Sequence, residues 1–280
     1  MKNYLIRVIL LEEIYGCCVQ VDDAERMFGK AYVKDFISQC PEFIVTKGYL
    51  CRLDKTQIGN FQKRVKESQK KIALAKSLIN HLGVLPWFVF AAVSGSSAYM
   101  NAQPEDDIDI FLVVELNRLW LTRFFAKVLF GLMGVRRILG NRNIKDKLCI
   151  NYYVSTDNLD LRKRSGGDFL TALEIVMLKP ILSEDYIKVV LAQNAWIKKY
   201  FPGLNLESDY FRAQRIPVVS IVMDFADWIA MKIQLAYMRV RKHPWRDCVL
   251  NRSEIKVYDK SGWDKRARKL DKAVKDFKAQ

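Results

Sequence analysis

The sequence predicts an α/β (α+β) fold whose core is a small mixed sheet, with a compact module before it and a helical region after it. Two apolar runs, at 85–93 and 108–114, have the length and composition of strands. The flanking segments space their apolar residues as amphipathic helices do, and Gly or Pro separates them. We therefore expect four parts, at 1–58, 59–85, 86–160 and 161–280.

Residues 1–58 are expected to form a small separate module. Its predicted elements are helices at 3–15, 22–28 and 31–39 and a hairpin at 43–53. Three helices and a hairpin resemble a winged helix, in which the third helix can enter a major groove while the hairpin touches phosphates. The third helix offers only Lys34 and Gln39 as evident contacts. Whether this winged-helix-like module binds DNA, RNA or protein therefore stays open.

Residues 59–85 form a basic connection, with a helix predicted at 61–82. Against the single acid Glu67, this helix carries six cations: Lys63, Arg64, Lys66, Lys70, Lys71 and Lys76. One interpretation is a solvated helix face. The other is a track of phosphate contacts that leads an acidic acceptor to the core.

The predicted core, 86–160, contains a pattern suited to a metal-bound triphosphate. Ser94-Gly95-Ser96-Ser97 follows an apolar run, and Asp107-Ile108-Asp109-Ile110 opens the next strand. Alternation along a strand places both carboxylates on one face, where their oxygens suit Mg²⁺. Glycine permits close approach of the backbone to a phosphate, and free amides at the start of the helix expected at 96–101 attract anions. The pattern thus predicts a metal at Asp107 and Asp109, and nucleotide contacts at Gly95, Ser96 and Ser97.

These residues resemble the signature of the DNA polymerase beta-like nucleotidyltransferase superfamily, in which a Gly-Ser turn precedes an Asp-x-Asp strand. The wider wording, Ser-Gly-Ser-Ser-Ala-Tyr-Met-Asn-Ala and then Asp-Asp-Ile-Asp-Ile, is similar to stand-alone bacterial and archaeal members. The resemblance implies transfer of a nucleoside monophosphate from an NTP to a hydroxyl of an RNA end, a protein or a small molecule. It also implies Mg²⁺ (or Mn²⁺) at Asp107 and Asp109. The alternative is an ordinary surface turn followed by an acidic strand start.

The chain departs from the superfamily at the third carboxylate. The matching strand is predicted at 147–154, and Asn151 stands where an acid is expected. An amide cannot act as a general base at neutral pH. Three explanations stay open: metal and water activate the acceptor, Asp146 or Glu174 reaches in, or a catalytically degenerate core senses nucleotides or binds nucleic acid. Lys147 is expected to contact the nucleotide, within a basic approach that also contains Arg136, Arg137, Arg142 and Lys145.

The segment 161–280 is predicted to be helical. A mobile junction is expected at 162–167, and helices at 169–178, 184–200 and 218–240, with a frayed surface helix at 260–280. The resemblance implies that this region shapes the nucleotide or acceptor pocket. Asn194 and Trp196 are interpreted as packing residues rather than base contacts.

Composition favours a polyanionic partner, such as the NTP and RNA or another nucleic acid. Forty-six Lys and Arg against thirty-one Asp and Glu give a net charge of +15. Six cysteines without metal-ligand spacing and two histidines do not predict a zinc site, and Cys17 and Cys18 are expected to be buried and reduced. No feature indicates an oligomeric state.

Two further apolar stretches, at 119–135 and 218–240, are interrupted by charges and are predicted to pack on the protein. Stable membrane insertion is therefore not expected, whereas peripheral contact stays open. Glu12 and Glu13 interrupt the apolar run near the N-terminus, so no signal peptide is predicted and we expect a cytoplasmic protein.

Overall fold

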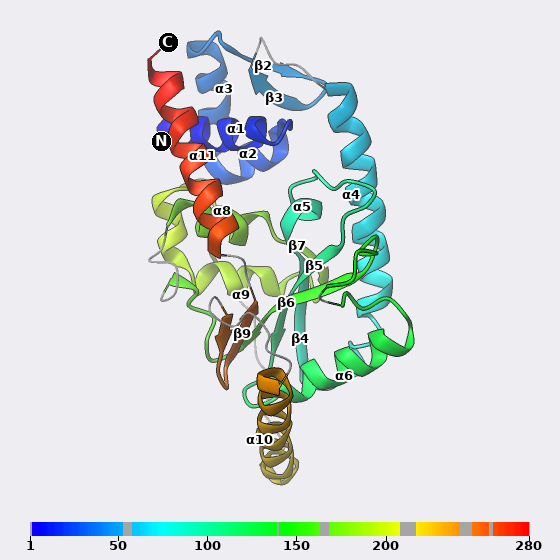
Figure 1. Cartoon of the computed structure of the whole chain (residues 1–280). Coiled ribbons are helices and arrows are strands. Elements are labelled where there is room, and N and C mark those ends of the chain that lie inside the picture. Colours follow the sequence, from blue (N-terminus) through cyan, green and yellow to red (C-terminus); the bar gives the residue numbers. More distant parts are fainter. Residues whose placement is uncertain are drawn as a thin grey trace.

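The computed structural model describes residues 2–52, 58–138, 140–162, 168–207, 217–240, 248–257 and 260–279. Figure 1 shows the N-terminal helices at one end of the molecule, the main sheet in the middle and helix α10 at the other end. Residues 163–167 of the expected junction and Leu53 of the expected hairpin lie outside the described residues.

The N-terminal module contains the three expected helices and the hairpin, with one additional strand. The helices are α1 (Lys2–Ile14), α2 (Val21–Phe28) and α3 (Lys30–Gln39). Strands β1 (Val19–Gln20), β2 (Phe43–Thr46) and β3 (Tyr49–Arg52) form an antiparallel sheet in the order β1-β3-β2. The hairpin turns where Lys47 and Gly48 have φ values of 52° and 81°. The two residues of β1 were missed because so short a strand has no periodicity of its own.

The cysteine prediction was wrong for Cys18. Cys17 and Cys18 are both buried, as expected, but Cys18 forms a disulfide with Cys51, with the two Cα atoms 5.2 Å apart. The pairing of β1 with β3 brings these cysteines together across 33 residues. The pairing of two distant cysteines depends on tertiary structure, so the sequence alone did not predict it. A disulfide is also unusual for the cytoplasmic location that we expected, because disulfides are rare in that compartment.

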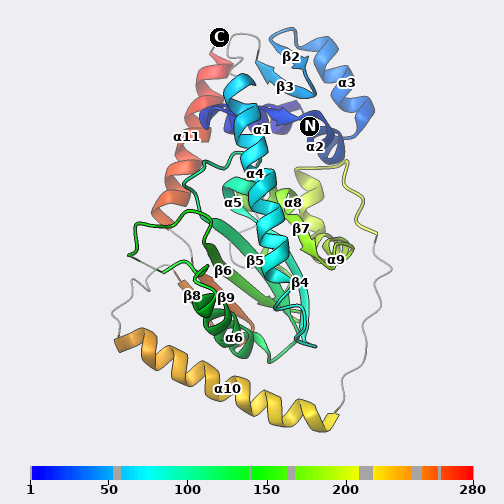
Figure 2. The same ribbon diagram turned by 90° about the vertical axis from the view of Figure 1, so that its right-hand side faces the viewer.

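Helix α4 (Ile58–Ile79) runs from the N-terminal module along the core (Figures 1 and 2). Lys63, Lys66 and Lys70 are exposed. Lys71 differs, because it is 1% exposed and its Nζ donates to Asp146 Oδ1 at 2.6 Å and to the Asp106 carbonyl at 2.9 Å. Neither interpretation of the basic helix therefore applies to Lys71, which holds the loop before β5.

The main sheet has the strand order β7-β4-β5-β6-β9-β8. Its strands are β4 (Phe88–Val93), β5 (Ile108–Val114), β6 (Leu148–Ser155), β7 (Lys179–Leu182), β8 (Cys248–Leu250) and β9 (Glu254–Val257). The β5–β6 pair is parallel and the other pairs are antiparallel, so the sheet is mixed as expected.

The prediction of a wholly helical C-terminal region was wrong, because it supplies β7, β8 and β9. Each is three or four residues long, too short to show a period. Strands β7 and β9 are defined by long-range pairing with β4 and β6, and β8 pairs with β9. Pro180 is tolerated in β7 because this strand is at the edge of the sheet.

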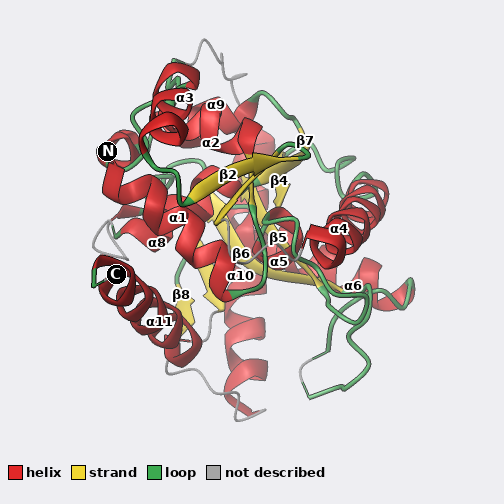
Figure 3. Cartoon of the chain, turned by 90° about the horizontal axis from the view of Figure 1, so that it is seen from above, coloured by secondary structure: helices red, strands yellow, loops and turns green. Residues whose placement is uncertain are grey.

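Alternate residues of the central strands enter two separate cores. Phe90, Phe111 and Val113 pack with α1–α3 and with α8 (Phe169–Met177) and α9 (Tyr186–Ala192). Ile110 and Leu112 pack with α4 and α6 (Leu119–Leu132). Figure 3 shows α4 and α6 on one side of the sheet and α1, α8 and α9 on the other. Burial on both faces explains why β4 and β5 read as continuous apolar runs.

The last helix, α11 (Lys260–Lys278), is largely exposed, as expected of a surface helix, but one side of it packs on the protein. It packs beside α1 (Figure 1), with Leu270 2% exposed and an ion pair of 2.8 Å between Arg7 and Asp271. The packed side contains Leu270 with the partly buried Trp263, Ala267, Val274 and Phe277. The many lysines of this segment masked that apolar spacing in the sequence. Asn194 is a packing residue, as expected: it is fully buried and its amide bonds the backbone of Leu161, Leu159 and Val190.

Candidate metal and nucleotide site

The two carboxylates of the Asp-x-Asp pattern lie together where β5 begins. Ile108 and Ile110 are fully buried, whereas Asp107 and Asp109 are partly exposed on the opposite face. This is the alternation that the sequence predicts. Lys71 and a hydrogen bond from the Asp146 amide to the Asp106 carbonyl hold the approach to this strand.

The Gly-Ser turn lies directly against this pair. Gly95 has a φ of +62°, and a Cβ built on it would lie 3.2 Å from Asp109 Cγ and closer still to Asp109 Oδ2. The Ser94 amide also donates to the Asp109 carbonyl at 2.9 Å. Only glycine meets both requirements, left-handed backbone and no side chain.

Strand β6 brings two more polar side chains to the carboxylates. Asn151 Nδ2 donates to Asp109 Oδ1 at 2.8 Å, and Cys149 is the β6 residue opposite Asp109. The parallel register shifts after the Ile110–Ile150 pair, so Asn151 is an extra residue in β6 at that point. Asn151 and Cys149 thus face Asp109 from one strand.

Asp107, Asp109 and Cys149 can together hold a metal ion. One possible ligand atom from each of these three described residues lies within 4.8 Å of the other two. Two carboxylates alone suit a hard cation such as Mg²⁺, whereas a thiolate suits softer ions. The identity of the metal therefore depends on whether Cys149 ligates. Cys149 lies two residues before Asn151 on the same strand face. Its role as a possible ligand was missed because only the spacing between cysteines was considered.

The electrostatics of the pair are uneven. Burial raises the pKa of Asp109 to about 7, and the Asp107 charge acts in the same direction while Arg137 opposes it. Arg137 forms an ion pair with Asp107. Burial and the two carboxylates also raise the pKa of the Cys149 thiol, which is thus protonated at neutral pH without a cation. A divalent cation would offset the repulsion between the two acids.

The two serines of the turn have different surroundings. Ser96 Oγ donates to Asp106 Oδ2 at 3.1 Å, and the same carboxylate oxygen accepts from the Gln103 amide at 2.9 Å. Ser97 is 1% exposed, so its side chain belongs to the interior. Helix α5 (Gly95–Ala98) has only four residues, so its dipole adds little attraction for an anion.

Lys147 and its neighbours line a separate hollow. Lys147 Nζ donates to the Gly134 carbonyl at 2.7 Å and Arg136 donates to the Lys127 carbonyl at 3.2 Å. The hollow encloses about 330 Å³ and is lined by Gly131, Gly134, Arg136, Ile138, Asn141, Asn143 and Lys147. Arg137, which follows the lining residue Arg136 in the chain, pairs with Asp107 instead.

Neither acid considered as a substitute for Asn151 belongs to the metal cluster. Asp146 pairs with Lys71, and Glu174 on α8 pairs with Arg266 at 3.6 Å. Among the described His, Cys, Asp and Glu residues, the cluster that contains Asp107 and Asp109 is completed by the thiol of Cys149 rather than by a third carboxylate.

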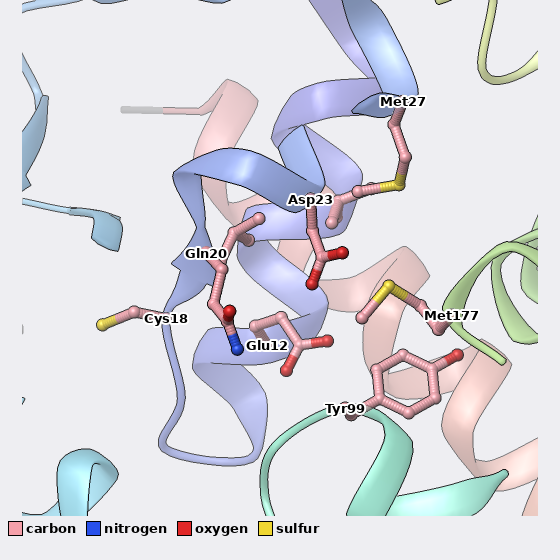
Figure 4. Close-up of a pocket in the computed structure, with 9 residues that line it drawn as sticks. Glu12, Cys18, Gln20, Asp23, Met27, Tyr99 and Met177 are labelled. Atoms are coloured by element: carbon pink, nitrogen blue, oxygen red, sulfur yellow. The ribbon is translucent and has the colours of Figure 1, made fainter. Parts of the chain in front are cut away.

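A second cavity lies between the N-terminal module and Tyr99, just after α5. It measures about 10 Å³, room for one water molecule, and Figure 4 shows Glu12, Asp23, Met177 and Tyr99 around it. Burial raises the pKa of Glu12 to about 8, although the charge of Arg266 opposes the shift. Arg266 lies 4.9 Å from the centroid of the Tyr99 ring. Glu12, Arg266 and Tyr99 thus connect α1, α11 and the turn of the site. The cavity between them is too small for a substrate.

Comparison of the chain with protein-family models, curated proteins and solved structures finds no match. The fold and the site define a mixed α/β protein with a carboxylate and thiol cluster able to hold a metal ion.

Proposed function

We propose that the protein is a metal-dependent nucleotidyltransferase. The observation that supports this most is the contact between Gly95 and the Asp109 carboxylate, with Asp107 beside it. A glycine with positive φ against a pair of partly buried acids brings open backbone and cation ligands to the same place. A triphosphate needs both, because its oxygens must meet a cation and its chain must approach without a side chain in between.

In the proposed reaction, the oxygen of an acceptor hydroxyl attacks the α-phosphorus of an NTP. A new O–P bond forms, the bond between the α-phosphorus and the bridging oxygen to the β-phosphate breaks, and pyrophosphate leaves. The hydroxyl proton passes to solvent water, since Asn151 offers no basic carboxylate. When bound, the cation supplies charge stabilisation for the attacking and leaving oxygens.

Each residue of the site then has a specific task. Asp107 and Asp109 hold the cation, and the amide of Asn151 fixes one oxygen of Asp109 by hydrogen bonding. Arg137, now paired with Asp107, is placed to exchange that partner for a phosphate. Mg²⁺ and Mn²⁺ both fit the two carboxylates, whereas ligation by the Cys149 thiolate would favour a softer ion.

The alternative is a nucleotide-sensing or nucleic-acid-binding protein with a degenerate core. It is favoured by Asn151 in place of an acid and by the ion pair that occupies Asp107. The N-terminal module would then be the principal binding element, as a winged helix.

The test is transfer of label from each α-labelled NTP, with Mg²⁺ or Mn²⁺, to total RNA or protein. We expect transfer with the intact chain and none with Asp107→Asn or Asp109→Asn, while Glu105→Gln, which removes an exposed acid nearby, leaves transfer unchanged. Calorimetry with Mg²⁺ and a nonhydrolysable NTP separates the two proposals. Metal-dependent binding of the NTP without transfer of label supports the sensor. If both Asp variants bind Mg²⁺ and the NTP as tightly as the unaltered chain, there is no metal site at these residues.

A further inference from the structure

Helix α10 (Pro217–Val240) presents an unusual distribution of side chains. Three of its polar residues face the protein. Asp227 accepts from the Leu121 amide at 2.8 Å, and Asp224 pairs with Arg118. Gln234 donates to the Trp120 carbonyl at 2.8 Å. Helix α10 is therefore held by these polar contacts together with apolar packing, because Met238 is buried and Ala230, Met231 and Leu235 pack on the core that α6 shares.

The opposite face of α10 is apolar and exposed. Ile221 is 74% exposed, Phe225 62%, Ile233 64% and Val240 82%. The full exposed apolar set is Ile221, Val222, Phe225, Trp228, Ile229, Ile233, Tyr237 and Val240. These residues recur at the three- and four-residue spacing of one helix face. A continuous apolar stripe of this kind marks an interaction site rather than ordinary surface.

Helix α6, the neighbour of α10, also exposes apolar side chains. Phe124, Val128 and Leu132 are exposed at a spacing of four residues, with Leu132 84% exposed. Figures 1 and 2 show α6 and α10 at the same end of the molecule, away from the N-terminal module. Both helices thus expose apolar side chains at one end of the protein, and we call these exposed residues the α6–α10 face.

The charges on this face have one sign. From Ser220 to Val240, where side chains are described, both acids of α10 engage the α6 side, and the exposed charged residues are Lys232 and Arg239. Lys232 Nζ lies 5.4 Å from the centroid of the Trp228 ring. Cations and an aromatic ring next to an aliphatic stripe suit the headgroup region of a bilayer.

We propose that the α6–α10 face binds the surface of an anionic lipid membrane, with α10 lying in the plane of the interface. At 1.5 Å per residue, its 24 residues make a rod of about 36 Å. Among the described helices, none combines the length and apolarity that a membrane span needs. The geometry is that of an interfacial helix, in which apolar area and attraction to anionic headgroups both contribute to binding.

Charge selects the lipid surface over a second copy of the chain. Each copy has a net charge of +15, so two copies repel, whereas a negative surface attracts. The proposal is independent of the nucleotidyltransferase proposal, and it would place the protein's activity at a membrane.

Flotation of the full-length protein with vesicles tests the proposal. We expect binding to phosphatidylcholine vesicles that contain phosphatidylglycerol, weak binding to phosphatidylcholine alone, and loss of binding as salt rises. The double variant Phe225→Ser/Ile233→Ser should bind at least about tenfold more weakly, because it removes two large apolar side chains. Val45→Ser, at a 45% exposed position on β2, is the matched control and should bind as the unaltered chain does.

Circular dichroism and urea unfolding establish whether the variants fold. Vesicle binding by the unaltered chain tests the proposal even if a variant does not fold. The proposal is overturned if the chain binds neither vesicle type. It is also overturned if the double variant binds as well as the original, or if light scattering shows a dimer that the same double variant dissociates while vesicles are not bound.

Discussion

The Asp109 carboxylate occupies the space that a side chain on Gly95 would need. The two residues are on different elements, α5 and β5, and the Ser94 amide joins their backbones through the Asp109 carbonyl. A substitution at Gly95 therefore changes both the backbone of the turn and the position of a cation ligand.

Gly95→Ala should abolish binding of Mg²⁺ or Mn²⁺ and destabilise the fold by roughly 1–3 kcal/mol, since a Cβ there meets Asp109 and φ is +62°. Calorimetry and urea unfolding measure the two effects. Gly48→Ala is the matched control, because it has a φ of +81° and nothing within 4 Å of its Cβ. It should cost stability while leaving metal binding intact. Equal metal affinity in Gly95→Ala and the original chain would contradict the assigned site.

Asn151→Asp should raise affinity for the divalent cation, because it adds a carboxylate beside Asp109 where the amide now donates. We expect label transfer to fall, since the added negative charge repels the incoming triphosphate. Asn151→Ala removes the donor without adding charge, so it should not raise metal affinity. A rise in transfer by Asn151→Asp would instead identify a degenerate core.

Glu12→Gln should flatten the dependence of stability on pH between about 4.5 and 8. The folded pKa of Glu12 is raised from 4.5 to about 8 by burial, so the unfolded chain binds fewer protons in this window and stability falls as pH rises. The slope removed is at most about 1.4 kcal/mol per pH unit. Urea unfolding at several pH values measures it, with the exposed Glu42→Gln as control. A slope unchanged in Glu12→Gln would show that Glu12 titrates normally in the folded chain.

Replacing Lys63, Lys66 and Lys70 of α4 by Gln should weaken binding to RNA or DNA and reduce the salt dependence of that binding. If all three contact phosphates, the slope of log affinity against log salt should fall by about 2 to 3. Fluorescence anisotropy in a salt titration measures this. The control removes three exposed lysines elsewhere, Lys188, Lys198 and Lys199. An equal loss in both variants would show a diffuse charge effect instead of a track along α4.

Local sequence pattern was sufficient where one segment determines its own structure. The alternation of Ile108 and Ile110 with the two acids predicted β5 with the observed bounds, and the positions of most helices followed from apolar spacing. Cys149 and Asn151 could be assigned to one face of β6 for the same reason. Side-chain period is a property of the strand itself, so it is readable before any partner is known.

Other features depended on partners far away in the chain. Strand β7 pairs with β4 and β9 pairs with β6, and β8 joins the sheet only through β9. Cys18 meets Cys51 only because β1 pairs with β3. Residue type predicts that a lysine is exposed and that large apolar side chains are buried. Lys71 is instead buried, and the apolar face of α10 is exposed. By itself, the sequence determined the mixed α/β class and the carboxylate pair; the tertiary structure decided which groups join that pair and which faces remain exposed, because long-range contacts leave no local period.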